Sequence, residues 1–149
     1  MIRFSKSSGK YGCFSNFYLC PVAFDGMNFS NSEAAWQSQK CVIISTKKNF
    51  EIKSPSQAKA SGRRVKLRED WEDVKYQLMI DVCYAKFTQN PALKEILLST
   101  GEEELIEDTT GWHDNIWGNC SCAKCMNIEG KNLLGKALME VRKKIREEE

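Results

Sequence analysis

Four chemically active side chains recur at helical spacing in the segment 29–41, which reads FSNSEAAWQSQKC. Positions i, i+3, i+4 and i+7 share one face of a helix, and they are occupied by Glu33, Trp36, Gln37 and Lys40. An acid, an indole, an amide and an amine on one face indicate a helix that borders a cleft. A structural interpretation is also open, because Glu33 follows Ser30 at the spacing of a capping box and Trp36 is then a core residue.

A loop late in the chain is a second candidate site. It is rich in acid, amide and indole groups, namely Trp112, His113, Asp114, Asn115 and Trp117. Such groups are seldom needed to hold a fold together, so their density in a loop favours a functional site. Asp114 would add a second carboxylate to Glu33, and two carboxylates in different environments can cleave a glycosidic bond. We expect Trp71 and Trp117 to sandwich a flat base.

Turns, caps and hydrophobic periodicity predict the elements that position these groups. Asp25-Gly26 between two short alternating segments predicts a hairpin over 22–29, which leads directly into a helix that starts near Ser30. Ser54 before Pro55 predicts a second helix start. The other expected elements are strands at 2–4 and 105–106, and helices at 55–61, 70–89, 91–98 and 132–145.

Two further segments are expected to contact a ligand. Segment 11–18, YGCFSNFY, holds Asn16 among aromatic residues and predicts an ordered loop that lines a pocket, although Asn in a loop more often caps its own backbone. A basic cluster follows Gly62 and consists of Arg63, Arg64, Lys66 and Arg68. Such a cluster is usually a solvated face, and it is also a candidate phosphate contact.

Length and composition limit the fold and the compartment. We expect the 149 residues to form one α+β domain over 1–149, mostly helical with a few short strands and a hairpin. The net charge of +2 is too small to indicate a dedicated nucleic-acid binder. The first residues show no secretion signal, no apolar run could span a bilayer, and the seven cysteines are an odd number. We therefore expect a reduced, cytoplasmic protein that does not engage a membrane.

A series of short motifs in a fixed order resembles the NADAR family, which is named for NAD and ADP-ribose. The motifs are FSNF at 14–17, SEAAWQSQK at 32–40, RxDW at 68–71, KF at 86–87, NP at 90–91, LLSTG at 97–101, DxxWG at 114–118 and GKNLLGKALMEVR at 130–142. Each motif alone is weak, but together they span nearly the whole chain. The family includes the N-glycosidases of riboflavin-biosynthesis intermediates.

The resemblance implies an α+β fold and hydrolysis of the N-glycosidic bond between C1 of a ribose and a base or an amine. Two substrate classes are known in the family: the ribosylaminopyrimidine phosphates of riboflavin synthesis, and ADP-ribose attached to guanine in nucleic acid. The family's catalytic positions match Glu33, Trp71 and Asp114, and Trp117 lies in the same motif as Asp114. We expect Glu33 to act at the ribose and Asp114 to serve as an acid or to orient hydroxyls, with no cofactor required for the chemistry.

Lys40 has three candidate roles in such a site. Its amine could attack C1 of the opened sugar and hold it as an imine, the usual use of a desolvated lysine. It could instead pair with Glu33 or hold a phosphate together with an arginine. The side chains expected to bind the substrate are Asn16, Trp36, Gln37, Arg63, Arg64 and Trp117.

The chain departs from the common family pattern after residue 118, where a glycine-rich turn is usual and this sequence reads NCSCAKCMNIEG. Cys120, Cys122 and Cys125, with His113 upstream, offer three thiolates and an imidazole for a tetrahedral structural zinc. The alternative is three reduced thiols in a loop. A zinc here would pin the loop that carries Asp114.

Two further functions would use the same residues without catalysis. A reader of ADP-ribose or of a nucleotide needs the aromatic and basic groups of the cleft but not both carboxylates. The presence of Glu33 and Asp114 in their family motifs therefore favours an enzyme. A zinc-pinned interaction module is the third interpretation.

Overall fold

The computed structural model describes residues 1–149 and consists mainly of helices. The strands are β1 Ile2–Phe4, β2 Leu19–Phe24, β3 Met27–Asn31 and β4 Leu105–Glu107. The α-helices are α1 Ser32–Ser38, α2 Ile44–Lys48, α3 Pro55–Gly62, α4 Trp71–Gln89, α5 Pro91–Ser99 and α6 Leu133–Glu147, and the 3-10 helices are η1 Gly12–Phe14 and η2 Asn49–Ile52. This helix-rich α+β composition with a few short strands confirms the predicted fold class.

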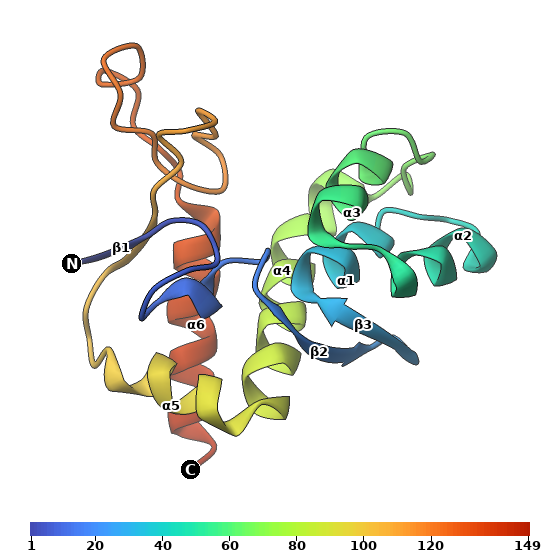
Figure 1. Cartoon of the computed structure of the whole chain (residues 1–149), viewed down its shortest axis with the longest axis horizontal. Helices are drawn as coiled ribbons and strands as arrows, with labels where there is room; N and C mark the ends of the chain where they lie inside the picture. The colour runs from blue at the N-terminus through green and yellow to red at the C-terminus, as the bar shows by residue number, and fades with distance from the viewer.

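The long helix α4 connects two groups of elements (Figure 1). On one side it packs against α6, which also contacts β4, and on the other side it contacts β2 and α1. Strands β1 and β4 pair in parallel, with Ile2 opposite Leu105. A continuous hydrophobic core contains residues from both groups. No helix combines the length and the apolar character that crossing a membrane requires.

The hairpin of β2 and β3 confirms its prediction from the sequence. The strands are antiparallel with Phe24 opposite Met27, and the turn residues Asp25 and Gly26 have φ values of 52° and 73°. Tight hairpin turns need positive φ at both central positions, which Asp-Gly adopts readily. Because β3 runs directly into α1, the hairpin fixes where that helix begins.

The capping box expected from Ser30 and Glu33 is wrong. Ser30 still belongs to β3, and the N-cap is Asn31, whose Oδ1 accepts a hydrogen bond from the Ala34 amide at 2.7 Å. Glu33 lies in the first turn, and its carboxylate bonds a side chain further along the helix instead of reaching back. The carboxylate of Glu33 is therefore not used to cap its own helix.

The boundaries of the next helices agree with the sequence signals. Helix α3 opens with a full capping box, in which Ser54 Oγ accepts from the Gln57 amide and Gln57 Oε1 accepts from the Ser54 amide. Helix α4 ends at Gln89, and Pro91 opens α5 as its first residue. Proline suits this position because the first helical amide has no partner within the helix.

A lysine is buried where α4 meets α1. Lys86 is 1% exposed, and its Nζ donates to the Ser15 carbonyl at 3.0 Å and to Ser32 Oγ at 3.3 Å. Ser32 Oγ in turn donates to Asn16 Oδ1 at 2.9 Å. Burial lowers the pKa of Lys86, because an apolar environment disfavours the charged amine. Lys86 therefore ties the loop after η1 and the start of α1 to the long helix.

We predict that Lys86→Ala lowers the free energy of unfolding by about 2–4 kcal/mol, because it opens a cavity and removes the donor to two buried acceptors. Urea unfolding followed by circular dichroism measures the change. Lys143→Ala, at an exposed position of α6, is the control and should change stability by less than about 0.5 kcal/mol. Equally small effects of both substitutions would contradict the structural role of Lys86.

Candidate active site

A cavity of about 580 Å³ opens where the loop after η1, helices α1 and α3, and the loop after β4 meet. Of the ten side chains expected to act in catalysis or to bind the substrate, eight line it: Asn16, Glu33, Trp36, Gln37, Lys40, Arg63, Asp114 and Trp117. Two others, Trp71 and Arg64, do not. Cavities of this volume bind small molecules in many proteins.

Glu33 is held in the cavity wall by its own helix. It is 8% exposed, and its Oε1 accepts a hydrogen bond from Gln37 Nε2 at 3.0 Å. Gln37 Oε1 faces Gly62, where a Cβ would lie 1.9 Å from that oxygen, so a side chain at position 62 would displace the Gln37 amide from its place beside Glu33. Burial raises the pKa of Glu33, while the bond from Gln37 and nearby lysine charges oppose the rise.

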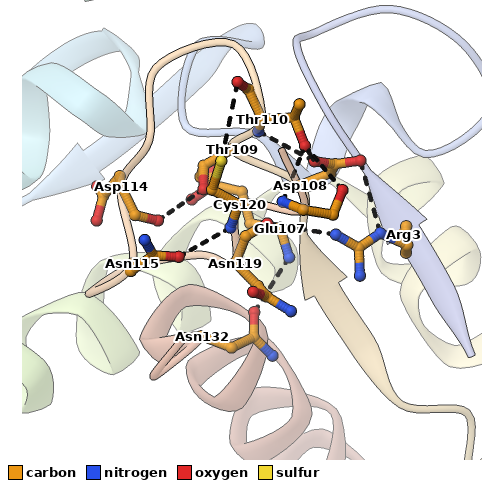
Figure 2. Close-up of polar contacts among 11 residues, drawn as sticks. Arg3, Glu107, Asp108, Thr109, Thr110, Asp114, Asn115, Asn119, Cys120 and Asn132 are labelled. Carbon is orange, nitrogen blue, oxygen red and sulfur yellow. Dashed lines mark hydrogen bonds and ion pairs between the residues drawn. The ribbon is translucent and has the colours of Figure 1, made fainter. Parts of the chain in front are cut away.

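Asp114 reaches the cavity from a turn that fixes its carboxylate. Its Oδ1 accepts hydrogen bonds from the amides of Ile116 and Trp117, both at 2.9 Å. The Asp114 carbonyl accepts from Thr109 Oγ1 at 2.6 Å, as Figure 2 shows. Oδ2 has no partner within the protein and is free to meet a ligand. The two carboxylates predicted from the sequence therefore meet in one cavity.

A third carboxylate, Glu107, lines the same cavity and was missed in the sequence. Its amide donates to Asn132 Oδ1 at 3.1 Å and its carbonyl accepts from the Asn119 amide at 2.8 Å (Figure 2), so its backbone is fixed on both sides. Burial raises the pKa of Glu107 to about 8, and the charges of Asp114 and Glu33 add to the rise. The signal in the sequence was an acid directly after the apolar pair of a predicted strand.

Lys40 lies in the turn that follows α1 and lines the cavity. Its Nζ is 3.4 Å from the Gly62 carbonyl, and 5.4 Å and 5.6 Å from the ring centroids of Trp36 and Trp71. Lys40 makes no direct ion pair with Glu33, one of its predicted alternatives. Burial lowers the pKa of Lys40, although the Glu33 charge opposes the shift. The amine therefore loses its proton more easily than an exposed lysine does.

The tryptophans form a cluster around Trp36. Its ring centroid lies 5.1 Å from that of Trp71 and 4.9 Å from that of Trp117, and its Nε1 donates to the Lys75 carbonyl at 3.1 Å. Since Trp71 packs against Trp36 and stays outside the cavity lining, a base stacked between Trp71 and Trp117 does not fit this arrangement. Trp117 and Trp112 line the cavity and can contact a base.

Basic side chains surround the carboxylates, but they are not the whole predicted cluster. Those that line the cavity are Lys6, Lys40, Lys59 and Arg63. Arg64 is exposed outside it, and Arg68 pairs with Asp70 at 2.6 Å. Asn16 lines the cavity as predicted, with its side chain fixed by Ser32.

One imidazole and three thiols meet in the loop after β4. His113 Nδ1 lies 3.3 Å from Cys120 Sγ, 3.3 Å from Cys122 Sγ and 3.7 Å from Cys125 Sγ. These four side chains could hold a metal ion, as the spacing in the sequence predicts. None of the four lines the cavity, so a metal bound there would not touch a ligand held by the carboxylates.

Comparison with known proteins agrees with the resemblance seen in the motifs. The sequence model of the NADAR domain matches residues 3–146. N-glycosidase YbiA of Escherichia coli is 39% identical over 97% of this chain and 88% of its own length. An N-glycosidase of Nostoc punctiforme is 36% identical over 97% of this chain and 92% of its own length.

Two further comparisons concern a longer protein and a solved structure. A riboflavin biosynthesis protein of Vibrio vulnificus is 31% identical over 98% of this chain, but the match covers 39% of that protein. The NMR structure of Escherichia coli YbiA superimposes with a TM-score of 0.85 at 36% identity, covering 99% of this chain and 85% of that chain. The likeness therefore extends through the whole fold.

The position of Glu107 predicts a pH-dependent stability. Its pKa in the folded protein is about 8 against an ordinary 4.5, so the folded protein keeps a proton that the unfolded chain loses. The resulting stabilisation is complete below about pH 4.5 and is lost as the pH rises towards about 8. Urea unfolding should show a free energy that falls by about 1–3 kcal/mol between about pH 5 and pH 8. Glu107→Gln should reduce this slope, whereas Glu104→Gln, an exposed neighbour, should leave it unchanged; equal slopes in all three proteins would contradict the prediction.

Proposed function

This chain belongs to the NADAR domain family, and we propose that it is an N-glycosidase that hydrolyses the bond between C1 of a phosphorylated ribose and a base or an amine. Relatives that are named N-glycosidases share 36–39% of its residues over nearly its whole length. The observation that carries the proposal is the meeting of three carboxylates and one partly desolvated amine, Lys40, in a single cavity.

Cleavage of an N-glycosidic bond needs a proton for the leaving base and stabilisation of positive charge at C1. Carboxylates in different environments can do both at one pH. With its pKa at about 8, Glu107 carries a proton near neutrality and is the proton donor of the proposal. Asp114 accepts two amide hydrogen bonds at Oδ1, which fix the direction of its carboxyl group, and it stabilises C1 or orients the ribose hydroxyls. Glu33 acts at the ribose from the opposite wall.

The lining of the cavity favours a phosphorylated substrate with a flat base. Lysine and arginine side chains bind phosphate by charge-assisted hydrogen bonds, and Lys59 and Arg63 are placed to do so. Trp112 and Trp117 offer flat apolar surfaces for the base. Relatives in Vibrio vulnificus and Zea mays are named riboflavin biosynthesis proteins, so a ribosylaminopyrimidine phosphate is the first substrate to test.

ADP-ribose linked to guanine in DNA is the second candidate substrate. The observation that favours it is the exposed pair Arg64 and Lys66, which continues from Arg63 away from the cavity. Two cations at that position could contact the phosphates of a nucleic acid whose modified base enters the site. Mass spectrometry of the released base distinguishes the two candidate substrates.

The proposed hydrolysis needs no cofactor, since carboxylates and water supply the groups for bond cleavage. The zinc predicted for the His/Cys cluster would therefore be structural. All seven cysteines are free thiols in the structure, which suits the reducing cytoplasm that we propose as the location of the protein.

We predict that the protein releases the free base from a ribosylaminopyrimidine phosphate, and that Glu33→Gln and Asp114→Asn lower kcat by about 10²–10⁴-fold, because each removes an ionisable group and keeps the shape. Mass spectrometry of released base and sugar measures turnover, and guanine-linked ADP-ribosyl DNA is tested in parallel. Glu104→Gln is the matched control and should keep full activity. If the protein binds ADP-ribose tightly but releases no base from either substrate, the enzyme proposal is wrong and the protein is a non-catalytic reader.

We propose a covalent step at Lys40. Its uncharged Nζ bonds C1, the C1–N bond to the base breaks, and the base leaves with that electron pair and a proton from Glu107. The Glu107 carboxylate takes a proton from Nζ, the C1 bond to the ring oxygen opens to give an iminium, and the ring oxygen takes that proton from Glu107. Water then adds to C1 and gives a proton to Glu107, and the C1–Nζ bond breaks as the hydroxyl proton moves to Nζ, which releases the sugar and restores the free amine. Trp71 acts only through Lys40 and Trp36, whose positions it supports.

Sodium borohydride added during turnover should trap the sugar on Lys40, because reduction converts an iminium into a stable amine. Peptide mapping by mass spectrometry locates the adduct. Lys40→Met should give none, whereas Lys59→Met should still form it at saturating substrate, since Lys59 is assigned to phosphate binding. If the wild-type protein turns over its substrate without any trapped adduct, the covalent step is wrong and Lys40 is a phosphate contact.

A further inference from the structure

The His/Cys cluster has the dimensions of a zinc site. Zinc bonds of about 2.3 Å to sulfur and 2.0–2.1 Å to nitrogen place the two kinds of ligand atom about 3.6 Å apart in a tetrahedron. The three separations from His113 Nδ1 to the thiols are 3.3, 3.3 and 3.7 Å. All four ligand atoms lie within 4.8 Å of one another, so side-chain shifts of about 1 Å or less would close the set around an ion.

The backbone supports the same interpretation. His113 has φ of 59°, in the left-handed region that non-glycine residues seldom occupy and that costs free energy unless other contacts define it. Cys120 and Cys125 are buried although the loop around them contains no helix. Three thiolates and one imidazole select a thiophilic ion such as zinc and leave it no open position.

We propose that His113, Cys120, Cys122 and Cys125 bind one Zn²⁺, and that this ion holds Asp114 in its position at the cavity. The first part depends only on the cluster. The second part rests on the proposed function, because Asp114 is a residue of the proposed reaction. The metal would position Asp114 without touching the substrate.

The connection between the cluster and Asp114 is short (Figure 2). His113 directly precedes Asp114, and the Cys120 amide donates to Asn115 Oδ1 at 2.9 Å. An ion shared by His113 and Cys120 therefore closes the turn 113–120 into a small ring, with Asp114 inside it. Such a cross-link removes conformations of the open loop, as other cross-links do.

The segment 120–130, which carries the three thiols, makes backbone hydrogen bonds only within itself. Between β4 and α6 the chain forms one isolated bridge, Asp108 with Asn119, and residues 115–118 are joined by backbone hydrogen bonds to residues 131–134 at the start of α6. The remainder consists of turns and irregular segments. Long connections without helices or strands are uncommon in compact proteins unless they are functional. Asp114 depends on this loop, whereas Glu33 is fixed by a helix in the core.

The metal site is tested by titration of the apo-protein under reducing conditions with Co²⁺, followed by displacement with Zn²⁺. One equivalent should bind with the visible bands of tetrahedral thiolate coordination. Loss of a group that only hydrogen-bonds a metal ligand lowers metal affinity by about 10–100-fold. Removal of a ligand itself, in Cys122→Ser or His113→Asn, should therefore lower the affinity by more than about 100-fold. Asparagine is chosen at position 113 because it tolerates positive φ.

Two variants serve as controls for the ligand set. His113→Cys keeps four ligands and should retain tetrahedral binding. Ser121→Ala, between two of the ligands, should bind like the wild type. Failure of the wild type to bind Co²⁺ or Zn²⁺, or equal affinity in His113→Asn and the wild type, would overturn the site.

Hydrogen exchange of the Ile116 and Trp117 amides, which bond Asp114 Oδ1, tests the second part without a substrate. Removal of zinc should speed their exchange about tenfold or more and leave the core amides of α4 unchanged. Unchanged exchange would overturn the positioning role even if the metal binds. Zinc-dependent exchange in a protein that cleaves neither substrate would instead refute the proposed function and leave the metal site intact.

Discussion

The structure depends on the burial of a short helix that is half polar. All seven residues of α1 are buried, and the polar ones are Ser32, Glu33, Gln37 and Ser38. A buried polar group without a partner costs about 1–3 kcal/mol, so the surrounding segments must supply donors and acceptors. Asn16, Asn31 and Lys86 do so from three different elements. Gln37 Oε1 is the buried side-chain atom left without a partner, and it belongs to a residue that lines the cavity.

Burial also sets the protonation of the site. It raises the pKa of Glu33 and Glu107 and lowers that of Lys40, so each of these groups is drawn towards its neutral form. The usual result of burying acids and amines together is an ion pair, which would make both unreactive. Here Lys40 instead faces indole rings and a carbonyl. A proton on an acid and an uncharged amine in the same cavity are what nucleophilic attack with proton transfer requires.

Local sequence signals predicted local structure well, but they failed where the structure depends on contacts between residues far apart in the sequence. Asp-Gly fixed the hairpin and Ser54 capped α3, because the required groups lie within a few residues. The N-cap of α1 is Asn31 instead of the expected Ser30, since β3 includes Ser30 and pairs as far as Asn31. Helical spacing placed Glu33 and its neighbours correctly on one face. The role of Lys86 depends on a carbonyl 71 residues away, and no pattern in the sequence contains that contact.

The two walls of the cavity differ in how they are held, and this difference has a chemical consequence. The wall that carries Glu33 belongs to the core, so its geometry is as stable as the fold. The wall that carries Asp114 belongs to a loop. There Asp114 accepts hydrogen bonds from Thr109, Ile116 and Trp117, and residues 115–118 accept backbone hydrogen bonds from the start of α6. The proposed bond cleavage needs both walls at once, because misplacement of a reacting group by about 1 Å can cost about 10²-fold in rate. In the proposed mechanism the position of the loop therefore matters as much as a group inside the cavity. A metal bound by the cluster at His113, the residue before Asp114, would restrain the loop at this point.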